Sequence, residues 1–426
     1  MSGRRGAPLH AVDAGMVRFR GKRNMRRAVI TGIGVASSIG SDVRTVRDAL
    51  RAGRSAVVFS ELLRDAGLRS HVWAPTEMPS ADRVDRRHLK LMTPSALQAF
   101  ACMQQAIDDA RLPPRLVSNE RTGVVVGNAC GVPLGHVHAV DAMRTRGLRG
   151  VGAYDLIHSM PSLHAACLAV AFGVRGVSYA ICGACAASAQ CIGHAVELIR
   201  ADTQDIVFAG GAEELGWEIA CQYDAIGALS TRFNDTPERA SRPYDMDRDG
   251  LVISGGAGIV VVEEMNHALE RGAPVYGEVI GYGATTDGVD MIVPSGEGAE
   301  RSMRLALRNV DLPIDYLNTH GTSTPAGDIR ELHAIRNVFG DAVPPLSSTK
   351  SMTGHAQGAA GVHEFIYALL MMDGGFIAPS VNIERLDDGA CGFDIVTATT
   401  PRKLTTVMTN SFGFGGVNAT LVMTSA

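Results

Sequence analysis

The stretch Cys182-Gly-Ala-Cys185-Ala-Ala-Ser-Ala-Gln-Cys-Ile-Gly holds the residue best suited to act as a nucleophile. Cys185 stands where a run of small residues turns into a pattern of apolar residues at helical spacing. We therefore expect it in the first turn of a buried helix, where free backbone N–H groups and the helix dipole lower the pKa of the thiol. A buried, inert cysteine fits the same local pattern, so Cys185 needs chemical partners elsewhere in the chain. The apolar positions that define the helix are Ala189, Ile192, Val196 and Ile199.

Two histidines lie in turns rich in glycine, serine and threonine, His320 in Asn318-Thr-His320-Gly-Thr and His355 in Thr353-Gly-His355. His320 follows a strand-like run, and the spacing from Asp328 to Glu331 predicts a capping box at the next helix. His355 opens a helix much as Cys185 does. A lone histidine is more often a core or surface residue than a catalyst, but two in such turns, with a helix-start cysteine, indicate a catalytic group. The inward face of the helix after His355 is assigned to Ala359, Val362, Ile366 and Leu369.

Metal and redox sites are the alternatives for these residue types. Cys182 and Cys185 form a C-x-x-C pair, but no second pair follows. His136-Val-His138 lies near Cys130 without a carboxylate at useful spacing. We expect no metal centre.

Composition favours a globular enzyme. The 426 residues are 46% hydrophobic and include 48 glycines, enough for one large core or two fused ones. The 40 basic and 44 acidic residues give a net charge of −4, which offers no argument for a nucleic-acid or membrane partner. No apolar run is long enough to span a bilayer. The eight cysteines lack regular spacing, so we expect a reducing compartment and a cytoplasmic location.

Residues 1–24 differ from the rest of the chain. They carry six basic residues against the single acid Asp13, and they contain no apolar stretch. We expect a basic N-terminal extension that is disordered, with a targeting peptide as the alternative. The basic residues are Arg4, Arg5, Arg18, Arg20, Lys22 and Arg23.

Strand-like and helical stretches alternate from about residue 25 onward, which predicts an α/β fold. The two halves of the chain also echo each other. Ala28-Val-Ile-Thr-Gly-Ile-Gly has a counterpart in Val275-Tyr-Gly-Glu-Val-Ile-Gly-Tyr-Gly, and the helix after Cys185 has one in the helix after His355.

From about Met25 to its C-terminus the chain resembles the β-ketoacyl-acyl carrier protein synthases, the elongating condensing enzymes of dissociated (type II) fatty acid synthesis. Several separated motifs in the expected order make this resemblance specific. Within the family, Ala184-Cys185-Ala and Asp205-Ile-Val-Phe-Ala-Gly-Gly look most like synthase I. Besides the cysteine and histidine motifs, the matching segments are Ala28-Val-Ile-Thr-Gly-Ile-Gly, Gln204-Asp-Ile-Val-Phe-Ala-Gly-Gly-Ala-Glu-Glu, Ala228-Leu-Ser-Thr, Arg242-Pro-Tyr-Asp with Arg248-Asp-Gly, and Asn410-Ser-Phe-Gly-Phe414-Gly-Gly-Val-Asn.

The resemblance implies a thiolase-like fold, with two similar halves of mixed sheet packed with helices in a layered α/β/α/β/α arrangement. We place the first half at residues 25–264 and the second at 265–426. The family also implies a homodimer.

The chemistry implied is a decarboxylative Claisen condensation, in which an acyltransferase joins a malonyl unit to an acyl group held as a thioester on Cys185. A thiolate suits this task because it both attacks and leaves readily. Loss of CO₂ from the malonyl thioester builds negative charge on the thioester oxygen, and two neutral imidazoles can stabilise that charge with N–H donors. His320 and His355 are the candidates for these donors.

By the same resemblance, Lys350 acts as a catalytic residue that maintains the electrostatics of the site together with Glu331, although a plain buried ion pair would also explain this lysine. The backbone N–H groups of Cys185 and Phe414 form the oxyanion hole, and Phe414 is the gate. Thr322 and Thr324 are expected to bind the pantetheine amides, with a turn-forming role as the alternative.

The substrates are expected on the 4′-phosphopantetheine of an acyl carrier protein, without a further cofactor. That carrier is acidic in this family, so a basic docking surface is expected near the entrance, although charge runs are usually just solvated faces. The candidates are Arg86, Arg87, Lys90, Arg146 and Arg149.

Other members of the superfamily remain as alternatives. A degradative thiolase needs a cysteine in the loop at 412–416, where this chain has phenylalanine, and a starter-unit synthase would resemble Cys-His-Asn. A specialised ketosynthase for polyenes or polyketides would keep every catalytic residue. A silent chain-length-factor-like partner would lack the nucleophile.

Departures from the synthase I pattern, such as Cys182-Gly183, Ala187, Gln190 and Leu134-Gly135-His136, surround the expected acyl pocket and leave the preferred chain length open.

Overall fold

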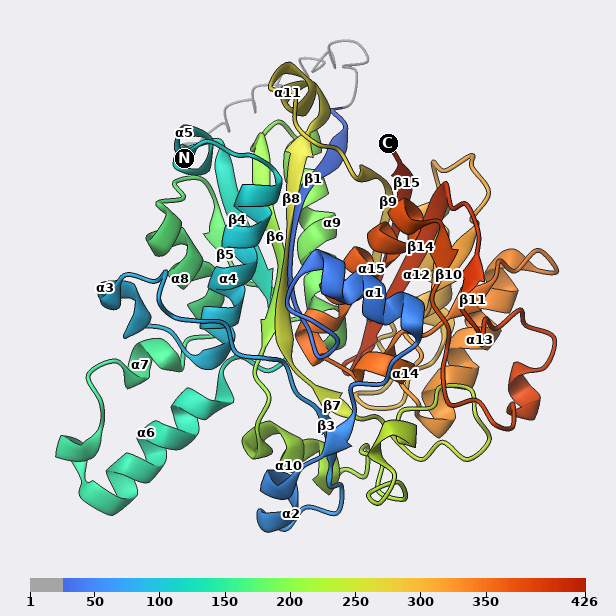
Figure 1. The fold of residues 1–426 in the computed structure, drawn as a ribbon, viewed down its shortest axis with the longest axis horizontal. Helices are drawn as coiled ribbons and strands as arrows, with labels where there is room; N and C mark the ends of the chain where they lie inside the picture. The colour runs from blue at the N-terminus through green and yellow to red at the C-terminus, as the bar shows by residue number, and fades with distance from the viewer. Residues whose placement is uncertain (1–25) are drawn as a thin grey trace, which may run out of the picture.

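The computed structural model describes residues 26–426, so the basic extension expected at 1–24 lies outside the described residues. A single ten-stranded sheet runs through the described chain in the order β11-β10-β14-β15-β9-β1-β8-β6-β4-β5. Figure 1 shows this sheet as two halves, on the left and right of the molecule. The halves meet where β1 pairs with β9 in antiparallel orientation.

The first half-sheet places its opening strand at the centre of the molecule. β1 and β8 are antiparallel, β8 and β6 are antiparallel, and β6, β4 and β5 run parallel. These strands read as continuous apolar and small-residue runs because helices cover both of their faces. The strands are β1 (Ala28–Ala36), β4 (Thr122–Gly127), β5 (Ser178–Tyr179), β6 (Ile206–Glu213) and β8 (Gly256–Glu264).

The second half-sheet repeats the first in strand order and direction. If the strands of each half are numbered in chain order, both halves arrange them from the centre outward as first, fifth, fourth, second and third. In the second half the first and fifth strands are antiparallel, as are the fifth and fourth, and the second and third strands run parallel to the fourth. The predicted internal repeat is therefore confirmed, with β1 and β9 as equivalent strands. The strands are β9 (Gly277–Thr286), β10 (Tyr316–Asn318), β11 (Leu346–Ser347), β14 (Thr406–Gly413) and β15 (Val417–Ser425).

Two equivalent helices, α9 (Ala187–Arg200) and α15 (Ala360–Gly374), form the middle layer between the half-sheets. Each of them contacts strands of both halves and the other helix. Their close approach relies on small residues: a Cβ added to Gly361 would lie 2.8 Å from the backbone nitrogen of Ala189. The apolar faces predicted for both helices are confirmed, because all eight residues assigned to them are buried.

The outer layers complete the α/β/α/β/α arrangement that the thiolase-like fold requires. α4 (Pro94–Asp109) and α8 (Leu163–Phe172) cover the first half-sheet, and α12 (Glu297–Leu307) covers the second, with α13 (Pro325–Phe339) packed beside it. Thr93 shows why α4 begins where it does. Its side chain caps the backbone N–H of Ala96, and Pro94 occupies the first turn.

The remaining elements connect these layers. α11 (Met265–Glu270) joins the half-sheets, and the domain boundary placed after residue 264 stays a prediction. α6 (Pro133–Arg146) and α7 (Asp155–His158) project from the body at the lower left of Figure 1. In residues 26–426 no helix has the length and apolar character needed to cross a lipid bilayer. The other helices are α1 (Val43–Ala52), α2 (Glu61–Asp65), α3 (Arg86–Leu89), α5 (Pro114–Val117), α10 (Trp217–Ala225) and α14 (Lys350–Thr353), and two small sheets contain β2 (Val58–Phe59), β3 (Val72–Ala74) and β7 (Ile253–Ser254), and β12 (Phe376–Ile377) and β13 (Thr400–Pro401).

His363 on α15 makes the stability of this core sensitive to acid. The ring is buried, its Nε2 lies 3.0 Å from the carbonyl oxygen of Ala257, and burial lowers its pKa to about 4. An unfolded chain takes up this proton below about pH 6.5. The folded state does so only near pH 4, so stability is lost as the pH falls through that window.

We expect His363→Gln to remove up to about 1.4 kcal/mol per pH unit from the pH dependence of the unfolding free energy between these values. Urea titrations from pH 7 to pH 4 would measure the slope. His333→Gln, at an exposed histidine, is the matched control. Equal slopes in wild type and His363→Gln would contradict the assignment.

Candidate active site

The predicted site residues follow the carboxyl ends of parallel strands. Cys185 comes after β5, His320 after β10, His355 after β11 and α14, and Phe414 directly after β14. In open α/β sheets this edge is where ligands bind. All four residues line one cavity of about 350 Å³, together with Thr322, Thr324 and Glu331.

Cys185 lies in a short 3-10 turn, Ala184–Ala186, immediately before α9 rather than within its first turn. The preceding residue, Ala184, has a φ of 47°, in the left-handed region that non-glycine residues rarely adopt. Backbone strain of this kind persists where the surrounding structure fixes a functional residue. The turn therefore holds the Cys185 sulfur at the cavity in a fixed orientation.

The expectation of a lowered thiol pKa is wrong for the resting site. Burial raises the pKa of Cys185 to about 12, and the charge of Lys350 only partly opposes that rise. Removing the thiol from water disfavours its charged form by more than the nearby ammonium group favours it. The resting nucleophile is a thiol, so its proton must leave as the sulfur attacks.

His320 and His355 both face Cys185. The sulfur and one nitrogen of each ring all lie within 4.8 Å of one another, and the ring centroids are 5.3 Å apart at an interplanar angle of 83°. Burial, and then the charge of Lys350, lowers the pKa of both rings well below the usual value for histidine. The two imidazoles are therefore neutral at physiological pH.

The hydrogen bonds around the two rings determine which ring nitrogen carries the proton and can donate it in a hydrogen bond. Nδ1 of His355 accepts the backbone N–H of Gln357 at 3.2 Å, so the neutral ring carries its proton on Nε2. Nδ1 of His320 is sealed from solvent and has no hydrogen-bond partner among residues 26–426, which leaves its Nε2 to meet the cavity. The Nε2 edges of both imidazole rings therefore face the cavity beside the Cys185 thiol.

The same three side chains are the one group among residues 26–426 with the spacing of a metal site. A metal on Nε2 of His355 would force the ring proton onto Nδ1, against the N–H of Gln357. The local hydrogen bonding therefore fits hydrogen-bond donation at His355 better than metal ligation.

Glu331 and Asp328 do not form the predicted capping box. α13 begins at Pro325 with Thr324 as its N-cap residue, and no side chain caps it. Instead, Glu331 accepts the backbone N–H groups of His320 and Gly321, each at 2.8 Å, and Asp328 accepts that of Thr322 at 2.9 Å. Burial raises the pKa of Glu331 to about 7. Both carboxyl groups hold the loop that carries His320.

Lys350 pairs with Glu364 of α15, not with Glu331 as its direct partner. Both side chains are almost fully buried. The ammonium still acts on the site through its charge, since it lowers the pKa of Cys185, His320, His355 and Glu331. Lys350 therefore forms its ion pair with Glu364, and its charge also acts on Glu331.

Lys350→Met should leave the Glu364 carboxyl buried without its cation. We expect a loss of about 3–5 kcal/mol in unfolding free energy, because an isolated buried charge is strongly destabilising. Lys350→Met combined with Glu364→Leu should recover much of that loss, since an apolar pair of similar volume needs no compensation. Urea unfolding of both variants measures this, and a double variant no more stable than the single one would contradict it.

Gly413 lies against the backbone of the nucleophile. A Cβ added there would lie 2.8 Å from the nitrogen of Cys185 and 2.9 Å from Cβ of Ala184. Only glycine allows β14 to approach the Cys185 N–H this closely. The next residue, Phe414, lines the cavity with its ring stacked on Tyr223, with centroids 6.1 Å apart.

We expect Gly413→Ala to lower kcat by about 10²–10³-fold, because the new methyl group would occupy the space beside the Cys185 N–H, the predicted oxyanion donor. Steady-state rates of condensation and the melting temperature should be measured together. A fall in rate in a variant that stays folded at the assay temperature supports the geometry. A wild-type rate would show that the Cys185 N–H is not used.

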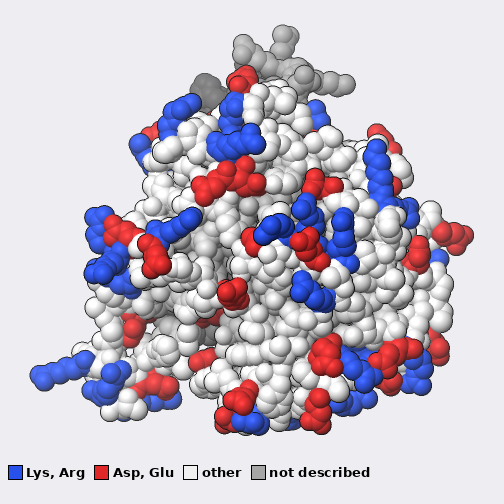
Figure 2. All heavy atoms as spheres, viewed as in Figure 1, with Lys and Arg blue, Asp and Glu red and all other residues white. Residues whose placement is uncertain are grey.

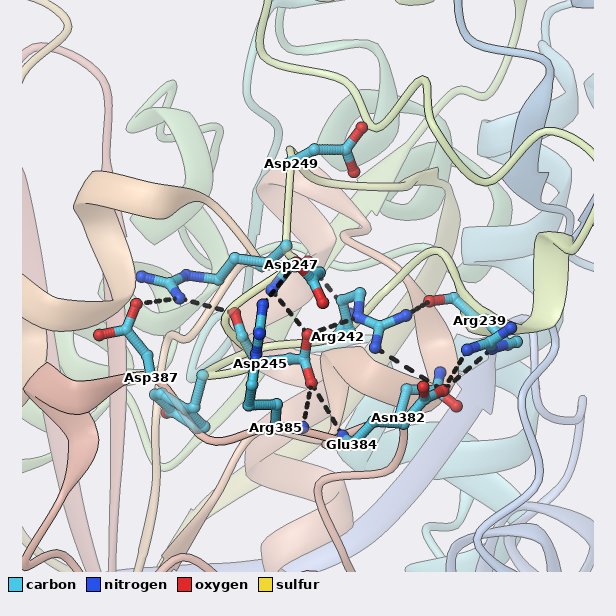
Figure 3. Close-up of polar contacts among 12 residues, drawn as sticks. Arg239, Arg242, Asp245, Asp247, Asp249, Asn382, Glu384, Arg385 and Asp387 are labelled. Atoms are coloured by element: carbon cyan, nitrogen blue, oxygen red, sulfur yellow. Dashed lines mark hydrogen bonds and ion pairs between the residues drawn. The ribbon is translucent and has the colours of Figure 1, made fainter.

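Thr322 and Thr324 line the cavity, and their hydroxyl oxygens are 3.0 Å apart. Figure 3 shows a polar network around the buried side chains of Arg242 and Asp245. Arg248 donates to the carbonyl oxygens of Thr324 and Pro325 at 3.2 and 2.8 Å. Asp245 accepts Nε of Arg242 at 2.9 Å and the backbone N–H groups of Glu384 and Arg385 at 2.8 and 2.9 Å. This network ties residues 239–249 to residues 382–387 beneath the cavity.

The five predicted docking residues do not line the cavity, as far as residues 26–426 show. Arg86 and Arg87 lie on α3 with Lys90 just after it, while Arg146 ends α6 and Arg149 lies in the next turn. Figure 2 shows basic side chains gathered over the far end of α6. Arg87 is partly neutralised by Asp85 at 2.8 Å, and Lys90 lies over the ring of Tyr154. Their docking role stays a prediction.

Three residues of the site escaped prediction from the sequence. Glu364 occurs in a helix with no motif to distinguish it, and Arg248 was noted only as part of a matching segment. Tyr223 is a single aromatic residue before the Ala228-Leu-Ser-Thr segment. Of these three residues, only Arg248 carried a signal that could have been used for prediction, because an arginine that is buried requires carboxylate or carbonyl partners.

Comparison with known proteins agrees with the family resemblance of the sequence. The family pattern described as Beta-ketoacyl synthase, N-terminal domain, matches residues 25–268, and the pattern for the C-terminal domain matches residues 276–384. The chain is 58% identical over 401 residues to the 3-oxoacyl-[acyl-carrier-protein] synthase 1 of Escherichia coli K12, covering 94% of this chain and 99% of that protein. It is 54% identical to the protein of the same name from Haemophilus influenzae, covering 93% and 98%.

Solved structures give a similar result. A type II PKS acyl-carrier protein in complex with its ketosynthase bound to the hexaketide matches with a TM-score of 0.86 at 28% identity, covering 95% of this chain and 100% of that one. A β-ketoacyl synthase from Burkholderia phymatum matches with a TM-score of 0.89 at 33% identity, covering 94% and 100%.

Proposed function

The chain belongs to the β-ketoacyl synthase family, and from that premise we propose how its residues carry out the reaction. It is an acyltransferase, an elongating 3-oxoacyl-[acyl-carrier-protein] synthase of fatty acid biosynthesis. The observation that supports our assignment of the site is the convergence of the Cys185 thiol with the two neutral imidazoles of His320 and His355.

In the first step the sulfur of Cys185 attacks the carbonyl carbon of an acyl thioester on the carrier. The proton of the thiol passes to the departing pantetheine sulfur, so one thioester replaces another without redox change. The raised pKa of Cys185 means that proton loss and attack are coupled. The backbone N–H groups of Cys185 and Phe414 stabilise the oxyanion.

In the second step malonyl-carrier protein loses CO₂. The bond to the carboxylate breaks, its electron pair stays as the enolate of the thioester, and N–H donors of His320 and His355 stabilise the enolate oxygen. The enolate carbon then attacks the acyl carbon on Cys185, forms the new C–C bond and expels the thiolate, which is reprotonated. Burial, and then the charge of Lys350, lowers the pKa of both imidazoles and so keeps them neutral for this role.

The carrier protein is the partner, and its 4′-phosphopantetheine arm is the only cofactor that this chemistry needs. Thr322 and Thr324 bind the amides of that arm, and Glu331 positions His320. The basic residues near α3 and α6 are the docking candidates. The ketosynthase complex with its acyl-carrier protein supports such a partner.

The enzyme is a homodimer in this proposal. Exposed apolar side chains on α6, α7, α8 and the turn after α6 are candidates for contact with a second copy. All eight cysteines are free, as a reducing compartment requires, and we assign the enzyme to the cytoplasm. The exposed residues are Met143, Leu148, Leu156 and Val170.

The test is to incubate the enzyme with malonyl-carrier protein and a series of saturated and cis-unsaturated acyl-carrier proteins, and to follow products by mass spectrometry. We expect β-ketoacyl products two carbons longer than the primer, and none after alkylation of the enzyme with iodoacetamide. The preferred primer would separate general elongation from a specialised pathway. Absence of product with every primer would overturn the proposed mechanism.

A further inference from the structure

Glu213 carries a buried carboxyl group that the reaction described above does not use. It is the last residue of β6 and is 2% exposed. One of its oxygens, Oε2, accepts two backbone N–H groups, that of Ala129 at 2.6 Å and that of Gly358 at 3.0 Å. Ala129 follows β4 and Gly358 precedes α15, so a single atom joins two segments that are far apart in the sequence.

The second of these segments determines how the ring of His355 is bonded. Gly358 belongs to the 3-10 turn Gln357–Ala359, which connects His355 to α15. Gln357 has a φ of 50°, in the left-handed region that non-glycine residues rarely adopt, and its N–H donates to Nδ1 of His355 at 3.2 Å. Such a backbone conformation persists only where the surrounding structure holds it. The hydrogen bond from Gly358 to Glu213 is one of the contacts that hold this turn.

The internal repeat gives this contact a counterpart at the nucleophile. β6 and β14 are the fourth strands of their halves, and each packs at its end against the turn that opens the central helix of the other half. The last residue of each strand pairs with the first residue of the fifth strand, so Glu213 and Gly413 are equivalent positions. Gly413 lies against the nitrogen of Cys185, whereas Glu213 supplies a side-chain acceptor to the turn after His355.

We propose that Glu213 is a positioning residue for the decarboxylation step: it holds the turn at 357–359 and thereby keeps the proton of His355 on Nε2, where it can be donated to the enolate oxygen. The inference rests on the role proposed above for His355. Without the carboxyl group, Gly358 and Ala129 would each keep a buried N–H without this acceptor, which is unfavourable. The turn would then shift, and Nδ1 of His355 would lose the donor that fixes its tautomer.

The test needs one disruptive variant, one conservative variant and one control. Glu213→Ala removes the acceptor, and Glu213→Gln keeps an amide oxygen in its place. Burial raises the pKa of Glu213 to about 8, so the carboxyl group is largely neutral at neutral pH and glutamine is a close mimic. Glu214→Ala is the matched control, because Glu214 is the next residue, is also buried, and accepts the hydroxyl group of Ser95 at 3.2 Å.

We expect Glu213→Ala to lower kcat for condensation by about tenfold to 10²-fold, because small displacements of a catalytic group have effects of this size. Acyl transfer to Cys185 should remain, and Glu213→Gln and Glu214→Ala should keep close to the wild-type rate. Glu213→Ala should have no further effect in a His355→Ala background but its full effect in a His320→Ala background. Equal losses in both backgrounds would indicate a merely structural role and would overturn the inference.

The tautomer of His355 provides a second measurement that needs no turnover. In enzyme with ¹⁵N-labelled histidine, NMR should show the His355 proton on Nε2 in the wild type and a mixture of tautomers in Glu213→Ala. The same Nε2–H tautomer in both would contradict the inference. A wild type that shows this change of tautomer but forms no β-ketoacyl product would instead overturn the proposed function. If Glu213→Ala does not fold, Glu213→Asp takes its place in both measurements, because its carboxyl group is one methylene shorter and cannot accept both N–H groups where they lie.

Discussion

Cys185→Ala should abolish condensation with every acyl primer, while release of CO₂ from malonyl-carrier protein stays measurable. The acyl group needs a sulfur to hold it, and alanine offers none. In the proposed mechanism the decarboxylation step depends instead on His320 and His355, which the substitution leaves in place. Product analysis by mass spectrometry, together with a CO₂ assay, separates the two activities.

The control for this prediction is Cys391→Ala, at an exposed cysteine far from the cavity, which should keep the wild-type rate. Condensation that survives in Cys185→Ala would exclude Cys185 as the acyl carrier. Loss of both activities in a folded variant would show that the cysteine also takes part in decarboxylation.

His320→Ala and His355→Ala should each trap the enzyme in its acylated form. In the proposed mechanism each ring supplies one donor to the enolate oxygen, and removal of a single donor of this kind typically lowers kcat by about 10²–10³-fold. The double variant should fall further, but by less than the product of the single effects, because the two donors act on one oxygen. Acyl transfer to Cys185 should remain, so single-turnover experiments would show the adduct without elongation.

The exposed His333 provides the matched control, since His333→Ala removes an imidazole from α13 without touching the cavity. A variant of either cavity histidine that cannot be acylated would place that ring in the first step instead. A variant that condenses at the wild-type rate would exclude the ring from the reaction.

Much of this architecture could be predicted from local pattern. Hydrophobic spacing after Cys185 and after His355 identified α9 and α15 and their buried faces, and the similar opening strands indicated the repeat. The repeat extends to backbone detail: Ala184 and Gln357 have φ values of 47° and 50°, and α9 and α15 each begin three residues later. Patterns of this kind depend on residues that are close together in the chain, so they can be recognised in the sequence alone.

The partners of the charged groups could not be predicted in this way. Asp328 and Glu331 have the spacing of a capping box, but their side chains turn back to the loop at 320–322 because its N–H groups are buried and need acceptors. Lys350 reaches Glu364 across the junction of α14 and α15. These choices depend on three-dimensional packing, which the spacing of residues does not encode.

The pKa of Cys185 illustrates the same limit. Position before a helix argues for a lowered value, whereas burial among apolar residues argues for a raised one. The sequence indicates the first effect but not the depth of burial. At 5% exposure the second effect dominates, which makes proton transfer part of the acylation step.

The most direct test of the mechanism is a pulse and chase on the nucleophile. The enzyme is first mixed with acyl-carrier protein alone, and the adduct is located by peptide mapping; malonyl-carrier protein is then added. We expect the acyl group on Cys185 after the pulse, and its loss after the chase in equal amount with CO₂ and β-ketoacyl product. An adduct on another residue, or a Cys185 adduct that malonyl-carrier protein does not discharge, would contradict the two-step mechanism.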